Sequence, residues 1–196
     1  MRKIKLTCAH ALVKHLIAQK VYIDGQVNPL FPGVFGIFGH GNVACLGQAL
    51  EENKDQLPTY RGHHEQNMAL TGVAYARAKR RKQIFIATSS VGPGSTNLVT
   101  ASAVAMNNRL PILFLPGDTD ANRMPDPVLQ QVEHFSNPGM TANDSFKSVT
   151  KYFDRITRPE QILQSLPQAI QTMLDPAECG PACLSLCQDV QGETFD

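Results

Sequence analysis

The sequence predicts an α/β fold, in which a doubly wound, mainly parallel sheet carries helices on both faces. Three observations favour this fold class. Short apolar segments alternate with amphipathic ones, 42% of the residues are hydrophobic against 18% charged, and 196 residues suit one domain. Strands that alternate with helices are joined by crossovers, which make neighbouring strands parallel. The same composition excludes intrinsic disorder as the main state.

The elements follow from the spacing of apolar residues and from the turn residues between them. A helix is predicted over residues 6–20, where Thr7 is available as a cap and apolar residues recur at Ala9, Leu12, Val13, Leu16 and Ile17. A turn-rich connector follows over residues 24–32. Strands are then expected at residues 34–38, 57–60, 84–88, 112–115 and 182–186, and helices at 42–52, 63–80, 95–107 and 159–174.

One segment breaks this alternation. Residues 117–144 are rich in Gly, Pro, Asn and Asp and form a longer loop than compact domains usually contain. Order is expected to return over residues 146–153. Loops of this length often carry function, so this one is a candidate for part of a site.

Charge and cysteine content narrow the class of protein. Lys plus Arg number 18 and Asp plus Glu 17, so no basic field is available for nucleic acid. No apolar stretch reaches the roughly 20 residues that span a bilayer, and the N-terminus has no apolar signal core. The chain is therefore expected to be cytoplasmic, without membrane or nucleic-acid partners.

The five cysteines are expected to be reduced thiols, because an odd number in a chain of this size does not indicate a disulfide framework. Cys179, Cys183 and Cys187 raise the alternative of a metal site. However, residues four apart in a strand lie about 13 Å apart, whereas each sulfur must lie about 2.3 Å from a shared ion. Buried structural cysteines are the preferred interpretation, and no metal ligands are predicted.

Two glycine turns follow predicted strands. Residues 92–97 (Gly-Pro-Gly-Ser-Thr-Asn) join a strand to a helix N-terminus, where free N–H groups favour an anion or a close ligand. The turn lacks the endings of a P-loop or a dinucleotide site, so a plain strand-to-helix turn is an equal alternative. Residues 39–42 (Gly-His-Gly-Asn) form the second turn. Both turns are expected at the carboxyl edge of the sheet, where open α/β sheets bind ligands.

Glu65 lies at the head of the apolar stripe of its predicted helix, where an acid is unexpected. The alternative is a first-turn glutamate favoured by the helix dipole, with Gly62 as the cap and His63 and His64 as turn residues. A serine hydrolase is a rival function, since Ser89, Ser90 and Ser95 lie at the same edge near histidines. The Gly-x-Ser-x-Gly elbow of such enzymes is absent.

Several motifs together resemble a known family. A glutamate that opens a helix, the segment ATSSVGPGSTN (residues 87–97) and the strand beginning Leu110-Pro111-Ile112 look like the pyrimidine-binding domain of thiamine-diphosphate enzymes of the acetolactate synthase type. More narrowly, residues 37–42, 125–131, 154–161 and 188–191 resemble the hydrolases of this type that act on a trihydroxycyclohexane-1,2-dione in myo-inositol catabolism. The resemblance runs from about Leu6 to the end. Because family members continue into a central and a diphosphate-binding domain, residues 1–196 are expected to be a single N-terminal domain of a longer enzyme.

The resemblance implies a role for each motif. Thiamine diphosphate is the expected cofactor, and its diphosphate and Mg²⁺ would be held by the C-terminal domain of a partner subunit in a homodimer or tetramer. Because another domain would bind the diphosphate, the resemblance argues against phosphate binding by the turn at Gly92. Glu65 matches the catalytic glutamate that hydrogen-bonds the pyrimidine. The other implied contacts are Gly39, His40, Gly41, Asn42, Pro93, Gly94 and Asn97 for the cofactor, and Gln131 and His134 for the small-molecule substrate.

The implied activity of the full-length protein is hydrolytic cleavage of a ring C–C bond, which yields 5-deoxyglucuronate. The isolated fragment is expected to be inactive. In one position the sequence departs from the family, because His64 precedes the glutamate where Asn is often found. Two alternatives remain open: another thiamine-diphosphate lyase or synthase of the same type, and a noncatalytic dimerisation module with the same fold.

Overall fold

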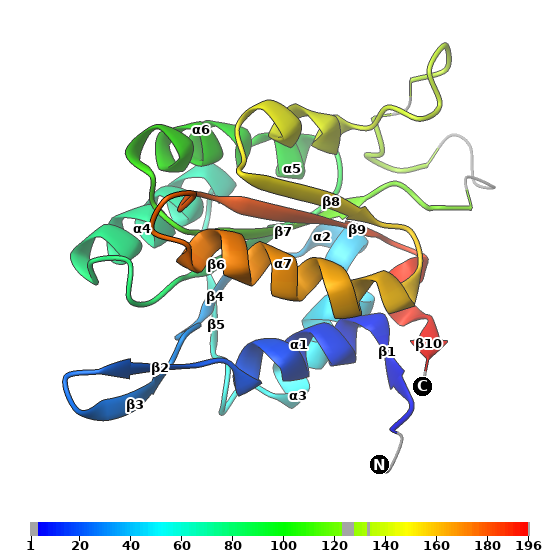
Figure 1. Cartoon of the computed structure of the whole chain (residues 1–196). Coiled ribbons are helices and arrows are strands. Elements are labelled where there is room, and N and C mark those ends of the chain that lie inside the picture. Colours follow the sequence, from blue (N-terminus) through cyan, green and yellow to red (C-terminus); the bar gives the residue numbers. More distant parts are fainter. Residues whose placement is uncertain (1–3, 123–127, 133, 196) are drawn as a thin grey trace.

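The centre of the molecule is a six-stranded parallel sheet (Figure 1). The computed structural model describes residues 4–122, 128–132 and 134–195. The strands lie in the order β5-β4-β6-β7-β9-β8, and all five neighbouring pairs are parallel. The strands are β4 (Val34–Ile37), β5 (Thr59–Arg61), β6 (Ile86–Ser89), β7 (Leu113–Asp118), β8 (Tyr152–Ile156) and β9 (Ala182–Cys187). The predicted parallel α/β sheet is confirmed.

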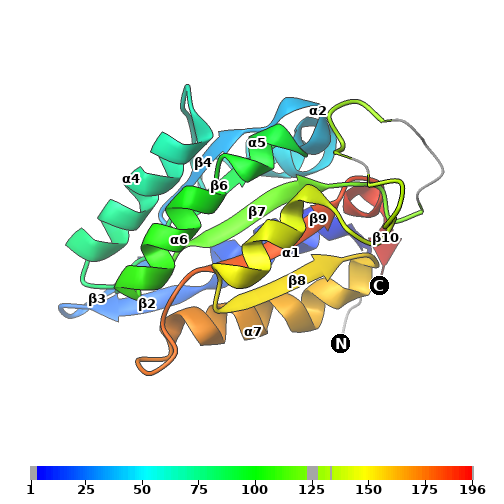
Figure 2. The same cartoon turned by 90° about the horizontal axis from the view of Figure 1, so that it is seen from above.

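Helices cover both faces of this sheet (Figures 1 and 2). One face carries α1 (Cys8–Ala18), α3 (Gln48–Glu52) and α7 (Ile162–Leu174), and the other carries α4 (Glu65–Ala78), α5 (Pro93–Thr96) and α6 (Val99–Asn108). Each face has its own apolar core, one centred on residues such as Leu12, Leu50 and Leu166 and one on Ala69, Ala101 and Phe146. The shorter helices are α2 (Gly39–Asn42), η1 (Val43–Gly47), η2 (Ala142–Ser148), η3 (Pro159–Gln161) and η4 (Val190–Gly192).

Helices α1 and α7 form for the reasons that the sequence indicates. The side chain of Thr7 caps α1 by accepting a hydrogen bond from the backbone N–H of His10 at 3.2 Å. Helix α7 follows the short η3 turn that Pro159 opens, and its apolar stripe is buried. Proline lies inside α7 at position 167, on the exposed side.

The predicted connector over residues 24–32 is wrong in part, because it contains the turn and the second strand of a β-hairpin. Strands β2 (Lys20–Ile23) and β3 (Gln26–Pro29) pair antiparallel around Asp24 and Gly25, whose φ angles are +50° and +84°. Asp-Gly favours this tight turn, because both residues tolerate positive φ. The sequence therefore contained the signal, but most of the hairpin's residues are exposed or only partly buried, so the usual apolar alternation is weak.

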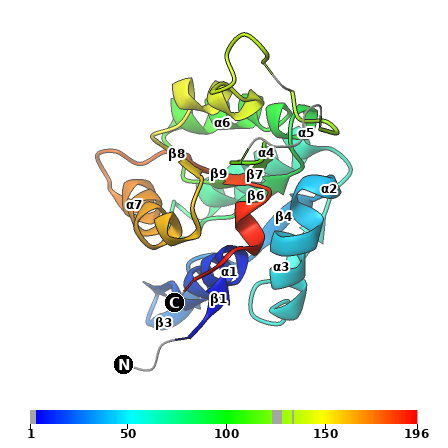
Figure 3. The ribbon, with the colours of Figure 1, turned by 90° about the vertical axis from the view of Figure 1, so that its right-hand side faces the viewer.

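A second unpredicted pairing joins the two ends of the described chain. Strand β1 (Leu6–Thr7) pairs antiparallel with β10 (Thr194–Phe195). Figure 3 shows both ends on the same side of the molecule. Such two-residue strands have too few residues for a periodic pattern, so no sequence signal was available.

Two predicted helices are interrupted. Residues 42–52 form α2, the π-helical η1 and α3 in succession, and residues 95–107 are divided between α5 and α6. The first break follows Asn42, whose side chain bonds to neighbouring strands, and π turns of this kind occur frequently at functional sites. Residues 146–153 contain the end of η2 and the start of β8, an edge strand that the sequence did not resolve.

The five cysteines are free. Burial raises the pKa of the Cys8 thiol to about 12, and it also raises the pKa values of Cys183 and Cys187 in β9. These thiols therefore stay protonated and uncharged at neutral pH. Within the described ranges, no group of three or more His, Cys, Asp or Glu side chains could hold a metal ion. None of the helices described is both long and apolar enough to cross a membrane.

Candidate functional site

The candidate site lies where the strand order reverses. The chain passes from β4 to β5 on one side and then returns to β6 on the other side of β4. Residues Ile37 and Ser89 are paired at the carboxyl ends of β4 and β6. Open α/β sheets bind ligands at such a switch point. The three motifs that the sequence singled out follow β4, β5 and β6, so the topology brings them to one edge.

Glu65 is the first residue of α4 and is partly buried. The amide Nδ2 of Asn97 donates a hydrogen bond to Glu65 Oε2 at 3.0 Å. The other oxygen, Oε1, lies 3.4 Å from the point at which a side chain on Gly94 would begin. Three predicted site residues from two separate segments therefore meet. Asn97 fixes one carboxylate oxygen and leaves the other beside a residue that has no side chain.

The turn after β6 is held in one conformation by Gly92. Its φ of +58° is strained for any residue with a side chain, and an added Cβ would lie 1.8 Å from the carbonyl oxygen of Gln130. Pro93 then occupies the first position of α5 and is exposed. The loop over residues 128–132 therefore packs directly on this turn.

The turn after β4 packs against the same segment. Gly39 has a φ of +52°, and a Cβ there would lie 2.4 Å from Ser90 Oγ. A Cβ on Gly41 would lie 2.7 Å from Val91 Cγ1. Larger residues at positions 39 and 41 would push the two turns apart. The glycines thus bring the backbones of the two turns into close contact.

Two buried polar atoms beside these turns have no hydrogen-bond partner among the residues that the structure describes. They are Nε2 of His40 and Oγ of Ser90, and Ser90 is only 7% exposed. Buried polar atoms are nearly always satisfied, by protein, water or ligand. An imidazole nitrogen and a hydroxyl are therefore available to a polar ligand at the edge that carries Glu65.

Asn42 supports the site from below. Its side chain is fully buried, and Nδ2 donates to Thr88 Oγ1, Ser89 O and Leu115 O at 2.9, 2.8 and 3.2 Å. Its Oδ1 accepts from Gln191 Nε2 at 2.8 Å. With every polar atom engaged, Asn42 ties β4 to β6 and β7 and is part of the frame beneath the turn.

Gln131 and His134 occupy different surroundings. Gln131 is buried and its Nε2 lies 3.4 Å from Gln188 Oε1, while Gln188 Nε2 lies 3.5 Å from the carbonyl oxygen of His40. A chain of amides thus links the loop to the glycine turn. His134 is exposed, and its ring lies 3.3 Å from Ser136 Oγ. Residues 125–127 of the motif at 125–131 lie outside the described residues.

At this edge, the described structure pairs none of the three candidate serines with a histidine. The hydroxyl of Ser89 donates to the carbonyl oxygen of Ser90, that of Ser95 donates to Asn143 Oδ1, and that of Ser90 has no partner among the described residues. A serine hydrolase needs an imidazole beside its nucleophile as the general base.

Sequence reasoning assigned no role to Ser90 beyond this rival function, nor to Gln188 and Gln191. All three lie in the motifs at residues 87–97 and 188–191. Their role depends on which hydroxyl or amide is left without a partner, and no pattern of residue types reveals that.

Comparisons with known proteins place the chain among enzymes of one type. Residues 32–141 match the family model described as thiamine pyrophosphate enzyme, N-terminal TPP binding domain. The chain is 51% identical over 195 residues to a protein of Listeria innocua, 52% over 196 residues to one of Clostridium tetani and 48% over 195 residues to one of Bacillus subtilis. Each of these relatives is named 3D-(3,5/4)-trihydroxycyclohexane-1,2-dione hydrolase. The matches cover 100% of this chain but only 30% or 31% of each relative.

Proposed function

The chain belongs to the thiamine pyrophosphate enzyme family, as its N-terminal TPP-binding domain, and from this premise we propose that it serves a hydrolase of 3D-(3,5/4)-trihydroxycyclohexane-1,2-dione. In the full-length protein, the reaction would break a ring C–C bond and release 5-deoxyglucuronate. Identity near 50% along the whole chain to relatives with this name supports the substrate class. Because the chain spans about a third of those relatives, the activity belongs to the longer protein.

The residues at the carboxyl edge fit the aminopyrimidine of thiamine diphosphate. This flat ring carries an amine that donates hydrogen bonds and ring nitrogens that accept them. A site for it therefore needs matching acceptors and donors from the protein in a narrow space. Glu65 offers a carboxylate oxygen, and Ser90 and His40 each have a polar atom without a partner in the described part of the chain. Gly39 and Gly41 let the two turns pack tightly against each other, and Gly94 places no side chain beside the Glu65 carboxylate.

In this proposal Glu65 hydrogen-bonds a ring nitrogen and shares a proton with it. Asn97 holds Oε2, so that Oε1 keeps a fixed position beside Gly94. Geometry of this kind matters because proton sharing needs an approach of about 2.6–3.2 Å. When bound, thiamine diphosphate supplies the carbanion chemistry that breaks a bond next to a carbonyl, and the protein supplies orientation. The other cofactor contacts would be Gly39, His40, Gly41, Pro93 and Gly94, with Asn42 as their support.

The remaining parts of the proposal concern the longer protein. A domain outside this chain, contributed by a partner subunit of a homo-oligomer, would hold the diphosphate and Mg²⁺, and the enzyme would work in the cytoplasm. The observation that carries the proposal is the meeting of Glu65, Gly94 and Asn97 at the switch point of the sheet.

The test is Glu65→Gln in the full-length enzyme. The change keeps the size of the side chain and removes the acid that shares the proton, so turnover should fall at least about 100-fold. The melting temperature should fall only slightly, because losing one first-turn charge lowers the free energy of unfolding by less than about 1 kcal/mol. Cofactor affinity, measured by calorimetry with Mg²⁺ present, should weaken in the same variant.

The matched control is Glu51→Gln, which removes a glutamate from the first turn of α3. It should leave turnover and cofactor affinity unchanged. Near-normal turnover in Glu65→Gln would show that Glu65 only serves the helix dipole. Turnover of other 2-oxo substrates in preference to the cyclic dione would favour another lyase or synthase. A full-length protein with no turnover would favour the dimerisation module.

Gln131 and His134 are proposed to lie near the substrate. The amide chain from Gln131 through Gln188 to His40 supports an effect of Gln131 on the glycine turn. We expect Gln131→Ala in the full-length enzyme to raise KM for the dione several-fold. His134→Ala, at an exposed loop position, serves as the comparison. Unchanged kinetics in Gln131→Ala would remove that residue from the site.

A further inference from the structure

Positive charge is concentrated where helix α4 ends. Five of the six residues over positions 77–82 are cationic: Arg77, Lys79, Arg80, Arg81 and Lys82. The whole chain has a formal net charge of only +1, so this segment is a local exception. Helix α4 begins with Glu65 at the carboxyl edge, and 14 residues at about 1.5 Å each place its other end about 21 Å away. The cationic segment is therefore remote from the candidate site.

The arginine side chains of this segment form no ion pair with any residue that the structure describes. Lys79 lies over the ring of Tyr75 at 5.6 Å, and Lys82 forms an ion pair with Asp24 at 3.7 Å. By contrast, the guanidinium groups of Arg77, Arg80 and Arg81 form neither an ion pair nor a side-chain hydrogen bond within the described part of the chain. Their charge is available to a group from solution.

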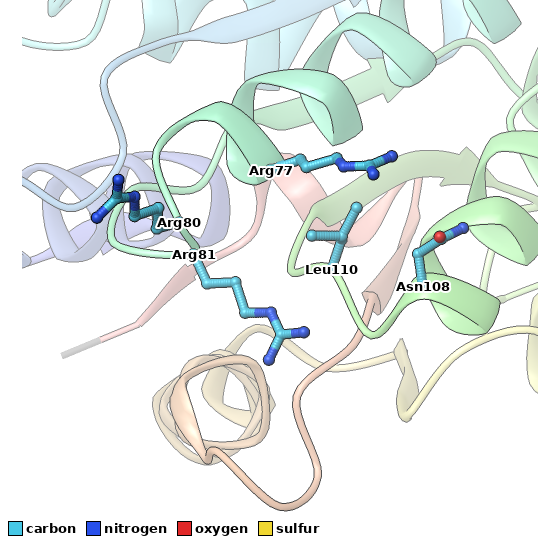
Figure 4. Close-up of a pocket in the computed structure, with 5 residues that line it drawn as sticks. All are labelled: Arg77, Arg80, Arg81, Asn108 and Leu110. Carbon is cyan, nitrogen blue, oxygen red and sulfur yellow. The ribbon is translucent and has the colours of Figure 1, made fainter.

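These arginines line a pocket of about 440 Å³ together with Asn108, the last residue of α6, and Leu110, which follows that helix (Figure 4). Figure 4 shows Arg77 and Arg81 extending on two sides of Leu110, with the amide of Asn108 beyond it. The guanidinium of Arg80 points the other way, so Arg80 contributes mainly its stem. No carboxylate is among these lining residues. The volume lies within the range of small-molecule pockets, and the charge facing it is positive.

The backbone around the pocket is unusual. Arg80, Arg81 and Arg109 have φ angles of +53°, +64° and +52°, in the region that glycine favours. The hydrogen bonds Arg81 N→Ala76 O at 2.8 Å and Leu110 N→Ala105 O at 3.0 Å mark helix endings at which glycine is the usual residue. A side chain there costs roughly 1–2 kcal/mol.

The negative end of a helix dipole repays only about 0.3–1 kcal/mol per cation. The dipole therefore accounts for one cation at each helix end. It does not account for two guanidinium groups held around one pocket.

We propose that this pocket binds a small phosphate-bearing anion with two or more negative charges. Guanidinium groups bind phosphate oxygens through paired N–H donors, and two of them can neutralise such a group. The amide of Asn108 adds a polar contact and Leu110 an apolar floor. The site does not depend on the proposed function, because it lies at the far end of α4 and uses none of the residues at the carboxyl edge.

The test uses inorganic tripolyphosphate as the probe, titrated calorimetrically into the full-length protein at low salt and without divalent cations. Wild type should bind it, and Arg77→Gln/Arg81→Gln should bind at least tenfold more weakly. Arg77→Lys/Arg81→Lys keeps the charge without the paired donors and should lie between the two. Circular dichroism melts show whether each variant is folded, and Glu65→Gln should bind the probe as wild type does.

The charge-matched control is Lys14→Gln/Lys20→Gln, which removes two exposed lysines that do not line the pocket. It should bind tripolyphosphate like wild type. Equal binding by wild type and Arg77→Gln/Arg81→Gln would overturn the proposal, and so would the absence of binding to wild type. An equal loss in the lysine control would show that net charge, and not this pocket, attracts the anion.

Discussion

Glycines set how closely the turns of the candidate site approach one another. Gly39 and Gly41 touch the Ser90–Val91 segment, and Gly92 touches Gln130. Gly94 leaves open the space beside the Glu65 carboxylate. At the scale of single residues, the position of Glu65 therefore depends on these glycines, which have no side chain, as well as on the Asn97 amide that donates to it.

Gly92→Ala should destabilise the protein more than Gly25→Ala. Both residues have positive φ, which costs an alanine about 1–2 kcal/mol. Among the described residues, the atom nearest to a new Cβ on Gly25 is Tyr22 Oη at 4.0 Å, whereas at Gly92 the carbonyl oxygen of Gln130 is 1.8 Å away. Urea unfolding of the two variants separates conformational cost from collision. An equal loss in the free energy of unfolding for both variants would mean that the loop over residues 128–132 shifts without cost to make room for the new methyl group.

The sequence predicted Glu65, Gly94 and Asn97 as site residues from motif order, and the structure brings these three together. It could not predict that the side chain of Asn42 is fully hydrogen-bonded inside the protein. A sequence does not show whether an asparagine in a glycine turn points inward or toward solvent. The unpartnered hydroxyl of Ser90 is likewise a property of three-dimensional packing. The roles of all the predicted site residues, Glu65 included, remain predictions.

Among the secondary-structure elements, a buried polar network joins three strands to η2. Arg155 of β8 donates to Asp118 of β7 at 2.8 Å, across β9, whose Ser185 also donates to Asp118. Arg155 also reaches Asp144, at 3.0 Å, in the capping box of η2. Asp118 is 2% exposed. The network anchors the far end of the long loop to the sheet.

Arg155→Met should cost about 3 kcal/mol in the free energy of unfolding, because it leaves the buried Asp118 carboxylate without its cation. Asp118→Asn/Arg155→Met should cost less than the sum of the two single changes, since the double variant has no unpaired charge. A double-mutant cycle from urea unfolding measures this coupling. Additive costs would show that Ser185 and the backbone satisfy Asp118 without Arg155.

The same elements show which parts of a fold a sequence pattern resolves. The buried strands and the amphipathic α1, α4 and α7 were predictable, because burial on one or both faces imposes a period on the residues. Strand β8 lies at the edge of the sheet and carries Asp154 and Arg155, so its pattern resembled that of a loop. The hairpin β2–β3 is largely exposed, and the divided helices depend on side-chain contacts with distant strands.

At the scale of the whole molecule, the chain of 196 residues forms an apolar core on each face of its sheet. It spans only about a third of the length of its relatives. We predict that this chain alone is inactive and binds thiamine diphosphate poorly. The strongest contacts to the cofactor, those of the charged diphosphate and its metal, would come from outside the chain. Calorimetry with thiamine diphosphate and Mg²⁺ is the measurement. Micromolar binding by the isolated chain would show that the site is misassigned.

The pairing of β1 with β10 has a mechanical consequence. Leu6 faces Phe195 and Thr7 faces Thr194, so the two ends leave this ladder at the same point. Tension applied between them would load its bonds one at a time, as in opening a zipper, and would next reach the bond from Cys8 N to Glu193 O. The six parallel strands would bear none of that load until both ends had peeled away. Under force, the domain should therefore yield first at its margins, while the edge that carries Glu65 is still folded.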